Sequence, residues 1–442
     1  MAWRAGAWSG CAWSILCATA LAAQHPHGPT GDRPAGDSGS VPSAPAVSFA
    51  LGGQATPAVS RVAPAMAGKT LTEWFVSSPV LTAHANAWGG RLSAMMELNL
   101  EGLTLARGEL TPGIYGEGYV DRRHPHTYLH EAVVTAAGTV AGVRASLSAG
   151  KGFAPFGTDD PMSRPLLKFP VNHHLAQVLE RGLVVVAVAR GAVALEAALF
   201  NGDEPTRPQD MPNWSRLGDS WAARATVTPL DGVAGHLELQ ASHARVRSPE
   251  FRDGGGLDQR KWSVSARYAD PVRPAQPYAL VEWARTGEYA GDRHVFAFST
   301  VLAEVSARWR GLGLAARAER TTRPESERLL DPFRTPRPPH DQSVLGITRW
   351  DIVTGRVSRT SRIGHVGAEP FVEIASAAAR ATIRSSFFEP AAFYGAGRIW
   401  PMTAGVRLTA GAPHGRMGRY GVASAEHHQH HLPRAGAPHG AH

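Results

Sequence analysis

The chain has 442 residues, of which 43% are hydrophobic and 19% are charged. Its mean hydropathy is −0.18, and no stretch beyond the N-terminus is long and apolar enough for a membrane helix, which excludes a bundle of membrane-spanning helices. The formal net charge is +8, but the arginines that dominate it stand singly along the chain and form no basic stripe. This dispersed pattern argues against nucleic-acid binding.

The first residues have the pattern of a cleaved secretory signal. Arg4 supplies a positive charge, residues 13–18 form a short apolar stretch, and the small residues at 20–22 suit a signal peptidase. We therefore predict a signal peptide over residues 1–23. The alternative is a single membrane anchor, which the short apolar stretch disfavours.

Both cysteines of the chain, Cys11 and Cys17, lie within this predicted signal. The mature chain would then contain no thiol and no disulfide, which removes cysteine-based zinc sites and cysteine nucleophiles from consideration. Such a chain fits export through an oxidising compartment. Leu16 is larger than the residue that a lipoprotein signal has before its cysteine, so we do not expect lipidation.

Composition divides the rest of the chain into three parts. Residues 24–70 are rich in Pro, Gly, Ala and Ser, and we predict that they form a disordered lead-in. Residues 425–442 form a His-rich tail. The body between them, residues 71–424, is predicted to be the folded domain.

The body repeats one pattern, in which short segments alternate apolar and polar residues between turn residues. The clearest segments span residues 92–101, 221–228, 262–269, 301–310, 312–319 and 402–410. A period of two predicts β-strands with one apolar and one polar face. We predict about 14 to 16 strands, and an even number is the rule for bacterial membrane barrels.

Strands of this kind suit either a soluble β-sandwich or a membrane β-barrel. The export signal, the charged residues on the polar faces, and aromatic residues at segment ends, such as Trp221 and Trp309, favour the barrel. Short turns also alternate with long connections, the short ones near residues 89–90, 138–142, 190–191 and 311, the long ones over 102–130, 152–181, 202–219 and 321–341. We therefore predict an all-β fold, a transmembrane antiparallel up-and-down β-barrel, in the outer membrane of a Gram-negative bacterium.

Four segments of the predicted long connections are distinctive. They are GEGYVDRRHPHTYLHE (116–131), KGFAPFGTDDPM (151–162), KFPVNHHLAQVLER (168–181) and LFNGDEP (199–205). Together they resemble a family of largely uncharacterised bacterial outer-membrane proteins with porin-like barrels, over residues 74–422, whose members look distantly similar to phosphate-selective porins. The resemblance implies an outer-membrane location and a porin-like fold. For such a barrel we expect outer-membrane lipids, small solutes and the barrel-assembly machinery as partners.

Charged residues on the polar faces of the predicted strands would line the lumen. The pore-lining candidates are Glu97, Arg224, Glu238, Arg267, Glu304, Arg308, Arg317 and Arg407. Charged side chains in a pore set ion preference through their local field. The first functional hypothesis is therefore a porin-like barrel, without enzymatic activity, that lets small and charged solutes diffuse.

The second hypothesis is a barrel that captures a transition metal. The candidate ligands are His124, His126, His130 and Glu131, which lie in one long connection, and the His-rich tail adds further imidazoles. An extended chain would point His124 and His126 the same way, whereas a helical turn would place His126 and His130 on one face. Either arrangement suits Zn²⁺ or Cu²⁺. The alternative is a loop that folds into the barrel mouth, where these side chains bind carbonyl and carboxylate groups and no cofactor is needed.

The third hypothesis is an outer-membrane hydrolase. The chain contains no Gly-x-Ser-x-Gly elbow and no phosphate-binding Walker sequence. The Gly-rich run at residues 311–316 lies within strand alternation and opens no predicted helix, so it is not a dinucleotide site. A serine and a histidine brought together by the fold stay possible in principle, because such sites depend on geometry and not on order in the chain.

Overall fold

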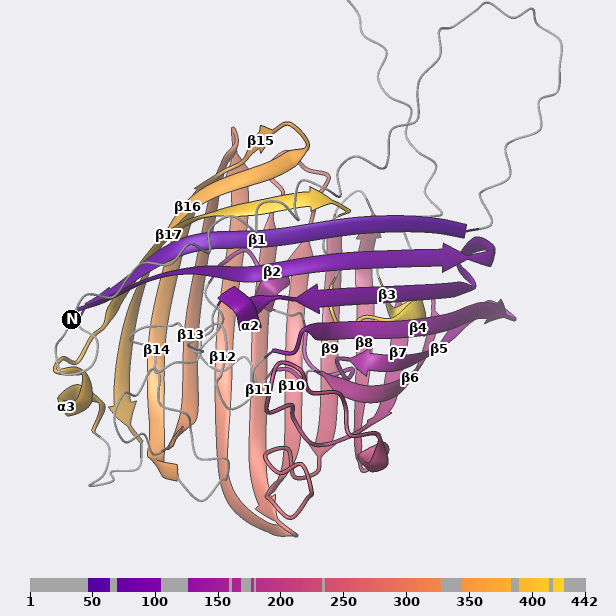
Figure 1. The fold of residues 1–442 in the computed structure, drawn as a ribbon, viewed down its shortest axis with the longest axis horizontal. Helices are drawn as coiled ribbons and strands as arrows, with labels where there is room; N and C mark the ends of the chain where they lie inside the picture. The colour runs from indigo at the N-terminus through magenta and orange to yellow at the C-terminus, as the bar shows by residue number, and fades with distance from the viewer. Residues whose placement is uncertain are drawn as a thin grey trace, which may run out of the picture. The chain divides into compact units, whose positions relative to one another are not determined.

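The computed structural model describes residues 47–63, 70–104, 126–158, 161–167, 176–178, 180–232, 235–326, 344–382, 389–412 and 416–424. Over these residues the chain forms one antiparallel β-sheet, in which each strand pairs with its neighbours in sequence (Figure 1). The last strand, β17, pairs with the first, β1, and this pairing closes the sheet into a barrel. The predicted all-β barrel is confirmed.

The strands are β1 (Val47–Ala63), β2 (Leu71–Ala87), β3 (Leu92–Asn99), β4 (Leu129–Val140), β5 (Val143–Gly152), β6 (Arg181–Arg190), β7 (Val193–Phe200), β8 (Ser220–Gly232), β9 (Gly235–Val246), β10 (Asp258–Ala269), β11 (Tyr278–Ala290), β12 (Arg293–Trp309), β13 (Leu312–Ser326), β14 (Val344–Arg359), β15 (Ser361–Ile363), β16 (Val366–Ala381) and β17 (Trp400–Gly411). Because β14 and β15 both pair with β16 and are separated by Thr360 alone, they act as one strand. The described part of the chain therefore forms a barrel of sixteen strands, an even number within the predicted range.

Short helices occur in the connections. They are η3 (Trp88–Gly90), α2 (Glu101–Thr104), η4 (Pro161–Ser163), η6 (Trp214–Arg216), α3 (Pro390–Tyr394) and η8 (Gly421–Ala423). No helix among the described residues is long and apolar enough to cross a membrane.

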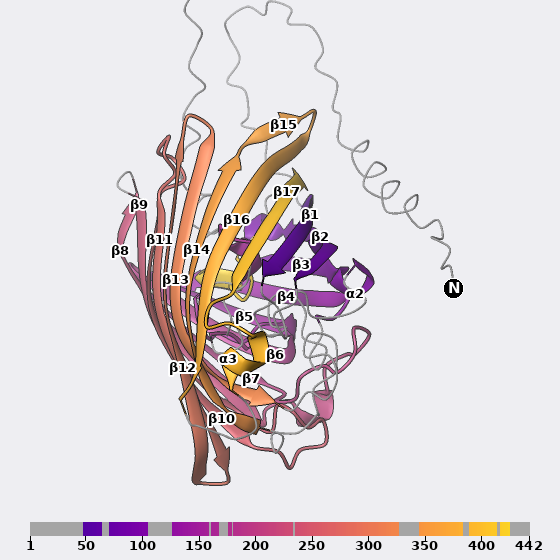
Figure 2. The ribbon, with the colours of Figure 1, turned by 90° about the vertical axis from the view of Figure 1, so that its left-hand side faces the viewer.

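The two faces of each strand differ as the sequence pattern predicts. On β8, Trp221 is 41% exposed while its neighbour Ala222 is 1% exposed. On β12, Val301 is 50% exposed, and Glu304 is fully buried. Apolar side chains thus point outward and polar side chains point into the barrel. In Figure 2, strands β8–β14 form one wall and β1–β7 the other, with β16 and β17 between them.

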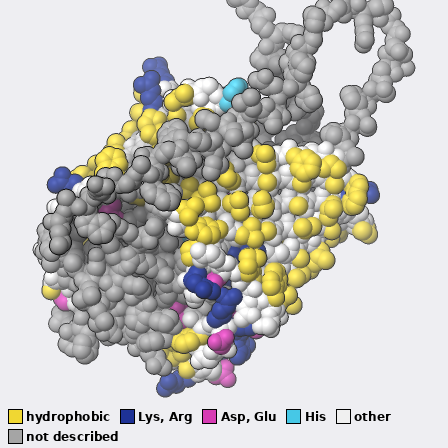
Figure 3. Space-filling view, viewed as in Figure 1, with side chains coloured by type: hydrophobic (Ala, Val, Ile, Leu, Met, Phe, Trp, Pro, Cys, Tyr) yellow, Lys and Arg dark blue, Asp and Glu magenta, His cyan; other side chains and the backbone are white. Residues whose placement is uncertain are grey.

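The outer face of the barrel is apolar. Figure 3 shows hydrophobic side chains spread over the wall of β1–β5, with charged side chains gathered near its lower margin. A closed barrel satisfies every strand edge with backbone hydrogen bonds, so an apolar outer wall of this kind is stable in lipid. Exposed tryptophans at strand ends, such as Trp88 and Trp309, occupy the positions of an interfacial aromatic girdle.

Most connections at one end of the barrel are short and most at the other end are long, the two-residue turn between β11 and β12 at residues 291–292 being an exception at the long-loop end. The turns at residues 141–142, 191–192 and 310–311 are short, and the connections at 100–128, 153–180 and 201–219 are long. The first strand begins and the last strand ends at the short-turn end, because β1 and β17 pair antiparallel through Gly52 and Gly411. In bacterial barrels the short turns face the periplasm and the long loops face outward.

The barrel begins earlier than the sequence analysis predicts. Residues 24–70 are predicted to be a disordered lead-in, but β1 lies within this range and pairs with β2 and β17. The composition argument fails because a strand with partners on both sides needs backbone hydrogen bonds and little side-chain volume. Pro57, which has no N–H to donate, lies beside the β-bulge between Gln54 and Thr56, where a missing donor is tolerated.

The barrel wall also ends earlier than predicted. The predicted domain runs to residue 424, but the last strand ends at Gly411, and residues 416–424 lie inside the barrel. The predicted signal peptide (1–23) and His-rich tail (425–442) lie outside the described residues, so both stay predictions.

The seam between β1 and β17 gives a test of barrel closure. A Cβ atom at Gly405 would lie 2.7 Å from the Pro57 carbonyl oxygen and 2.9 Å from the Phe371 ring, whereas a Cβ at Gly355 would have no atom within 4 Å. Gly405→Leu should destabilise the barrel by about 1–3 kcal/mol through overpacking. Gly355→Leu is the matched control. The measurement is the temperature at which each detergent-refolded barrel converts to its unfolded mobility on a gel, and equal temperatures for both variants would contradict the prediction.

Candidate functional site

All the predicted pore-lining residues lie at inward-facing positions of the strands. Glu97, Arg224, Glu238, Glu304 and Arg317 are buried, Arg267 and Arg407 are half-buried, and Arg308 is exposed. Most of these side chains therefore contact other groups inside the barrel and do not face open water. The groups that cover them belong in part to two chain segments that enter the lumen.

The first of these is the β5–β6 connection, residues 153–180. The Gly157 N–H donates to Ser242 Oγ on β9 at 3.0 Å, and Thr158 Oγ1 donates to Ser265 Oγ on β10 at 2.6 Å. Further along, Arg164 Nη2 donates to Glu282 Oε1 on β11 at 3.4 Å. The Leu167 N–H donates to Glu373 Oε2 on β16 at 2.6 Å. These partners stand on strands far around the barrel from β5. The connection therefore crosses the lumen and narrows it.

The second is the C-terminal luminal segment, residues 416–424, which follows β17. Its helix η8 packs against β4, β5, β6 and β7 from inside. Val422 lies against Ala187 and Ala189. The Val422 N–H donates to Ser146 Oγ at 3.1 Å. At the other end of the segment, Arg416 Nη1 donates to Glu238 Oε1 at 2.7 Å. The segment is thus held at both ends.

Tyr420 fixes the middle of the luminal segment. Its hydroxyl donates to Glu131 Oε1 and accepts the Phe153 N–H at 2.8 Å. Burial, together with the negative charge of Glu131, raises the pKa of Tyr420 well above its usual value of 10.0. The phenol therefore keeps its proton and stays a donor at any physiological pH.

Arg224 joins both luminal segments to the wall. Its Nε and Nη2 donate to the two carboxylate oxygens of Glu196, at 2.6 and 2.7 Å. It also donates to the carbonyls of Gly157 (3.2 Å) and Gly418 (2.8 Å). A planar guanidinium with five donors is suited to hold a carboxylate and two carbonyls at once.

Arg419 completes this cluster from the luminal segment itself. Its Nη1 lies 3.6 Å from Glu196 Oε2, and its Nη2 donates to the carbonyl of Thr158 at 2.9 Å. Glu196 therefore lies between two arginines, Arg224 and Arg419, all of them buried. A buried ion network of this kind is stable only while every member is present.

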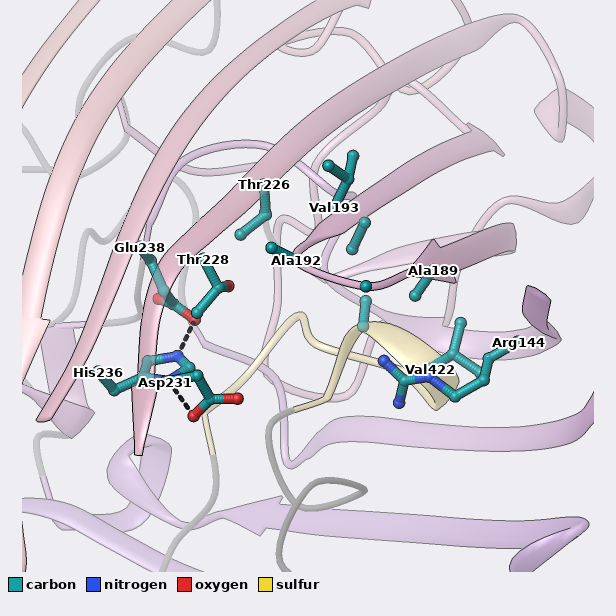
Figure 4. A pocket seen from close by; sticks show the side chains of 13 residues that line it. Arg144, Ala189, Ala192, Val193, Thr226, Thr228, Asp231, His236, Glu238 and Val422 are labelled. Atoms are coloured by element: carbon teal, nitrogen blue, oxygen red, sulfur yellow. Dashed lines mark hydrogen bonds and ion pairs between the residues drawn. The ribbon is translucent and has the colours of Figure 1, made fainter. Parts of the chain in front are cut away.

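A cavity of about 190 Å³ lies where the luminal segment meets the short-turn end of the barrel (Figure 4). His236 stands between Asp231 and Glu238, with its two ring nitrogens 3.1 and 3.2 Å from their carboxylate oxygens. An imidazole with a carboxylate at each nitrogen is favoured in its charged form, in which both nitrogens donate. Arg144 and Val422 line another side of the cavity, so its polar groups carry both signs of charge.

Of the predicted metal ligands, the described part of the structure brings His126 and His130 together and turns Glu131 to another partner. The His126 and His130 rings are 5.1 Å apart, but the Nδ1 of His126 faces Glu101 at 2.8 Å and that of His130 faces Glu180. Glu131 instead contacts Tyr420. His124 lies outside the described residues, and no group of three or more potential ligands that could hold a metal ion occurs among those described.

Comparison with known proteins agrees with the architecture. No protein-family model matches the chain, and no curated protein matches its sequence. Among solved structures, OprB of Pseudomonas putida has a TM-score of 0.50 at 7% identity, over 83% of this chain and 94% of its own. The anion-selective porin from Comamonas acidovorans has a TM-score of 0.49 at 12% identity, over 82% and 99%. At 7% identity the likeness to OprB concerns the fold alone.

The chain has the fold of a bacterial outer-membrane porin. Its closed barrel, apolar outer wall and polar interior place it in the outer membrane. The resemblance to porin-like outer-membrane barrels stated from the loop segments is thus confirmed at the level of the fold.

Three residues of the luminal network escaped the sequence analysis: Glu196, Arg419 and Tyr420. Glu196 interrupts an apolar run, and its inward direction follows from the alternation on β7. Arg419 and Tyr420 follow the last strand, in a stretch where Gly and Arg give no period. The one signal there is a tyrosine and two arginines shortly before a tail rich in Pro, Gly and His.

Arg224 should control how firmly the luminal segment is held. Val422 is buried, so in a chain that begins at residue 24, which contains no other cysteine, a cysteine in its place (Val422→Cys) should react slowly with a water-soluble thiol reagent. Adding Arg224→Gln removes charge-assisted hydrogen bonds worth about 1.5–3 kcal/mol each, and labelling should accelerate roughly tenfold or more. Arg320→Gln, on the outer wall, is the control. An unchanged labelling rate with Arg224→Gln would mean that other contacts hold the segment.

Proposed function

We propose that this barrel is a porin through which small, charged solutes diffuse, and that its lumen is narrowed by the β5–β6 connection and the C-terminal luminal segment. Diffusion through the barrel, and not catalysis, is the proposed activity. The observation that carries the proposal is the polar inner face, which runs through the strands of a barrel with an apolar outer wall.

The wall of β12–β17 supports the charged-solute part of the proposal. Arg317 lies 3.4 Å from both Glu304 and Glu319, and Arg356 lies 2.9 Å from Glu369. These arginines and glutamates are buried against one another, so they act on a solute through the field that they set along the inner face and not by direct contact. An uncharged lumen would offer a solute no such selection.

Arg308 is the charged inner-face residue best placed to meet entering ions. It is exposed, it lies at the short-turn end of β12, and its Nη1 donates to Gln276 Oε1 at 2.6 Å. Arg317, by contrast, is buried between two glutamates. The field at the short-turn mouth is therefore more easily changed at Arg308 than deeper in the lumen.

Removal of the luminal segment should widen the pore. A mature chain that stops at Ala412 should show a larger single-channel conductance in a planar bilayer than the full mature chain, because the contacts of residues 416–424 with β4–β9 are lost. A chain that stops at Ser424 lacks only the His-rich tail and serves as the control, with conductance close to that of the full chain. Equal conductance in all three forms, each heat-modifiable on a gel, would contradict the proposed narrowing.

Charge reversal at the mouth should change ion preference. Arg308→Glu replaces a cation by an anion on the inner face and should move the reversal potential in a salt gradient toward cation preference. Arg320→Glu makes the same change of charge on the outer wall, so its reversal potential should equal that of the unaltered protein. A wild-type reversal potential for Arg308→Glu would remove Arg308 from the conduction path.

A further inference from the structure

Arginines cluster on the lipid-facing side of the barrel as well as inside it. Arg320 on β13, Arg349 on β14 and Arg380 on β16 point outward, and their guanidinium groups surround a single carboxylate, Asp351. Arg380 Nη2 donates to Asp351 Oδ2 at 2.9 Å, and Arg349 Nε lies 3.6 Å from the same oxygen. Arg320 and Arg380 remain 64% and 62% exposed. We call these three arginines the outer arginine cluster.

The outer arginine cluster carries more positive charge than Asp351 neutralises. A fourth arginine, Arg398, reaches the same wall and donates to Ser376 Oγ on β16. Charged side chains on the lipid face of a barrel are costly near the bilayer midplane and tolerated near the interfaces. The excess charge therefore suits an anionic group at the interface, and planar guanidinium groups recognise phosphate oxygens in pairs.

A shallow apolar groove of about 520 Å³ lies on the same wall, on the short-turn side of the cluster. Its floor is a row of paired residues across β12, β13, β14 and β16: Val305, Ala316, Gly355 and Ile374. The two central residues are small and the two outer ones are branched, which hollows the middle of the row. A Cβ atom at Gly355 would meet nothing within 4 Å, so the hollow there is open.

The groove leads toward the arginines. On β13 the outward-facing residues after Ala316 are Ala318 and then Arg320, so on this strand a small side chain lies between the groove and the cluster, with the exposed Val353 of β14 beside it. Arg320 lies four positions beyond Ala316, about 13 Å at roughly 3.3 Å per residue. An extended acyl chain spans this distance. An apolar channel that ends at a surplus of guanidinium groups matches a lipid with an anionic headgroup.

The cluster lies toward the long-loop end of the barrel. On β13 the strand runs from Leu312 at the short-turn end to Ser326 at the long-loop end, and Arg320 lies beyond its middle. Since long loops face outward in bacterial barrels, the headgroup would belong to the outer leaflet.

We propose that the wall of β12–β16 binds a phosphorylated, multiply acylated glycolipid of the outer leaflet, with its phosphates on the outer arginine cluster and an acyl chain in the groove. The surplus of guanidinium groups binds the phosphates of the lipid, and the hollow at Gly355 holds its acyl chain. The site is on the outside of the barrel, so its occupation is independent of diffusion through the lumen.

The test measures binding of a defined lipid to the full mature chain in detergent, by native mass spectrometry. The probes are a diphosphorylated acylated disaccharide and the same molecule without phosphates. Replacing Arg320, Arg349 and Arg380 together by Gln should weaken binding of the diphosphorylated probe on the order of a hundredfold and leave the phosphate-free probe unchanged. Gly355→Leu, which fills the groove, should weaken binding of both probes.

A charge-matched control is available at the opposite end of the barrel. Replacing Arg310, Arg359 and Arg362 by Gln removes the same charge near the short turns and should leave binding of both probes as in the wild type. Each variant is first shown to be heat-modifiable, so that loss of binding is not loss of folding. The proposal is overturned if the cluster variant binds the diphosphorylated probe like the wild type, or if the control variant loses as much affinity.

Discussion

The buried pair of Arg224 and Glu196 is the contact on which the interior of this barrel depends. The bidentate pair joins β7 to β8, and the remaining donors of Arg224 hold one carbonyl from each luminal segment. Breaking such a pair from one side leaves a buried charge without a counter-ion, which costs about 3–5 kcal/mol. Arg419 adds a second cation at the same carboxylate, so the luminal segment itself supplies part of the charge balance. Wall and luminal segments are therefore one electrostatic unit.

The bilayer imposes the opposite arrangement on the other face of the same strands. Lipid accepts no unpaired backbone group, so the sheet closes, and it accepts few charges, so the outward positions are apolar over most of the wall. Because side chains alternate between the two faces of a strand, an odd or even position decides whether a residue faces the lipid or the lumen. Arg317 and Arg320 differ by three positions on β13; the first is buried among glutamates and the second stands on the lipid-facing wall. Their odd and even positions alone therefore place two arginines of one strand in different environments.

The sequence predicts those features that follow from periodicity. Alternation on segments such as 301–310 is enough to assign the inner and outer faces, and Gly-rich turns are enough to place the hairpins. It does not predict β1, because Ala, Ser and Gly form a strand only when two neighbours supply the hydrogen bonds. Nor does it predict the luminal segment, since Tyr420 and Arg419 are positioned by long-range contacts with β4 and β7 that no local pattern records.

The histidines also show that spacing in the sequence does not determine the partners of a side chain. Proximity in the chain makes His126 and His130 look like a pair of ligands, and the fold does bring their rings within 5.1 Å. However, the Nδ1 of each ring faces its own carboxylate: Glu101 for His126, from the start of the same β3–β4 connection, and Glu180 for His130, from the end of the β5–β6 connection. The contact of His130 with Glu180, 50 residues further along the chain, links the start of β4 to the end of the β5–β6 connection. The two histidines that suggest metal capture thus fix the β3–β4 connection and the end of the β5–β6 connection beside β4.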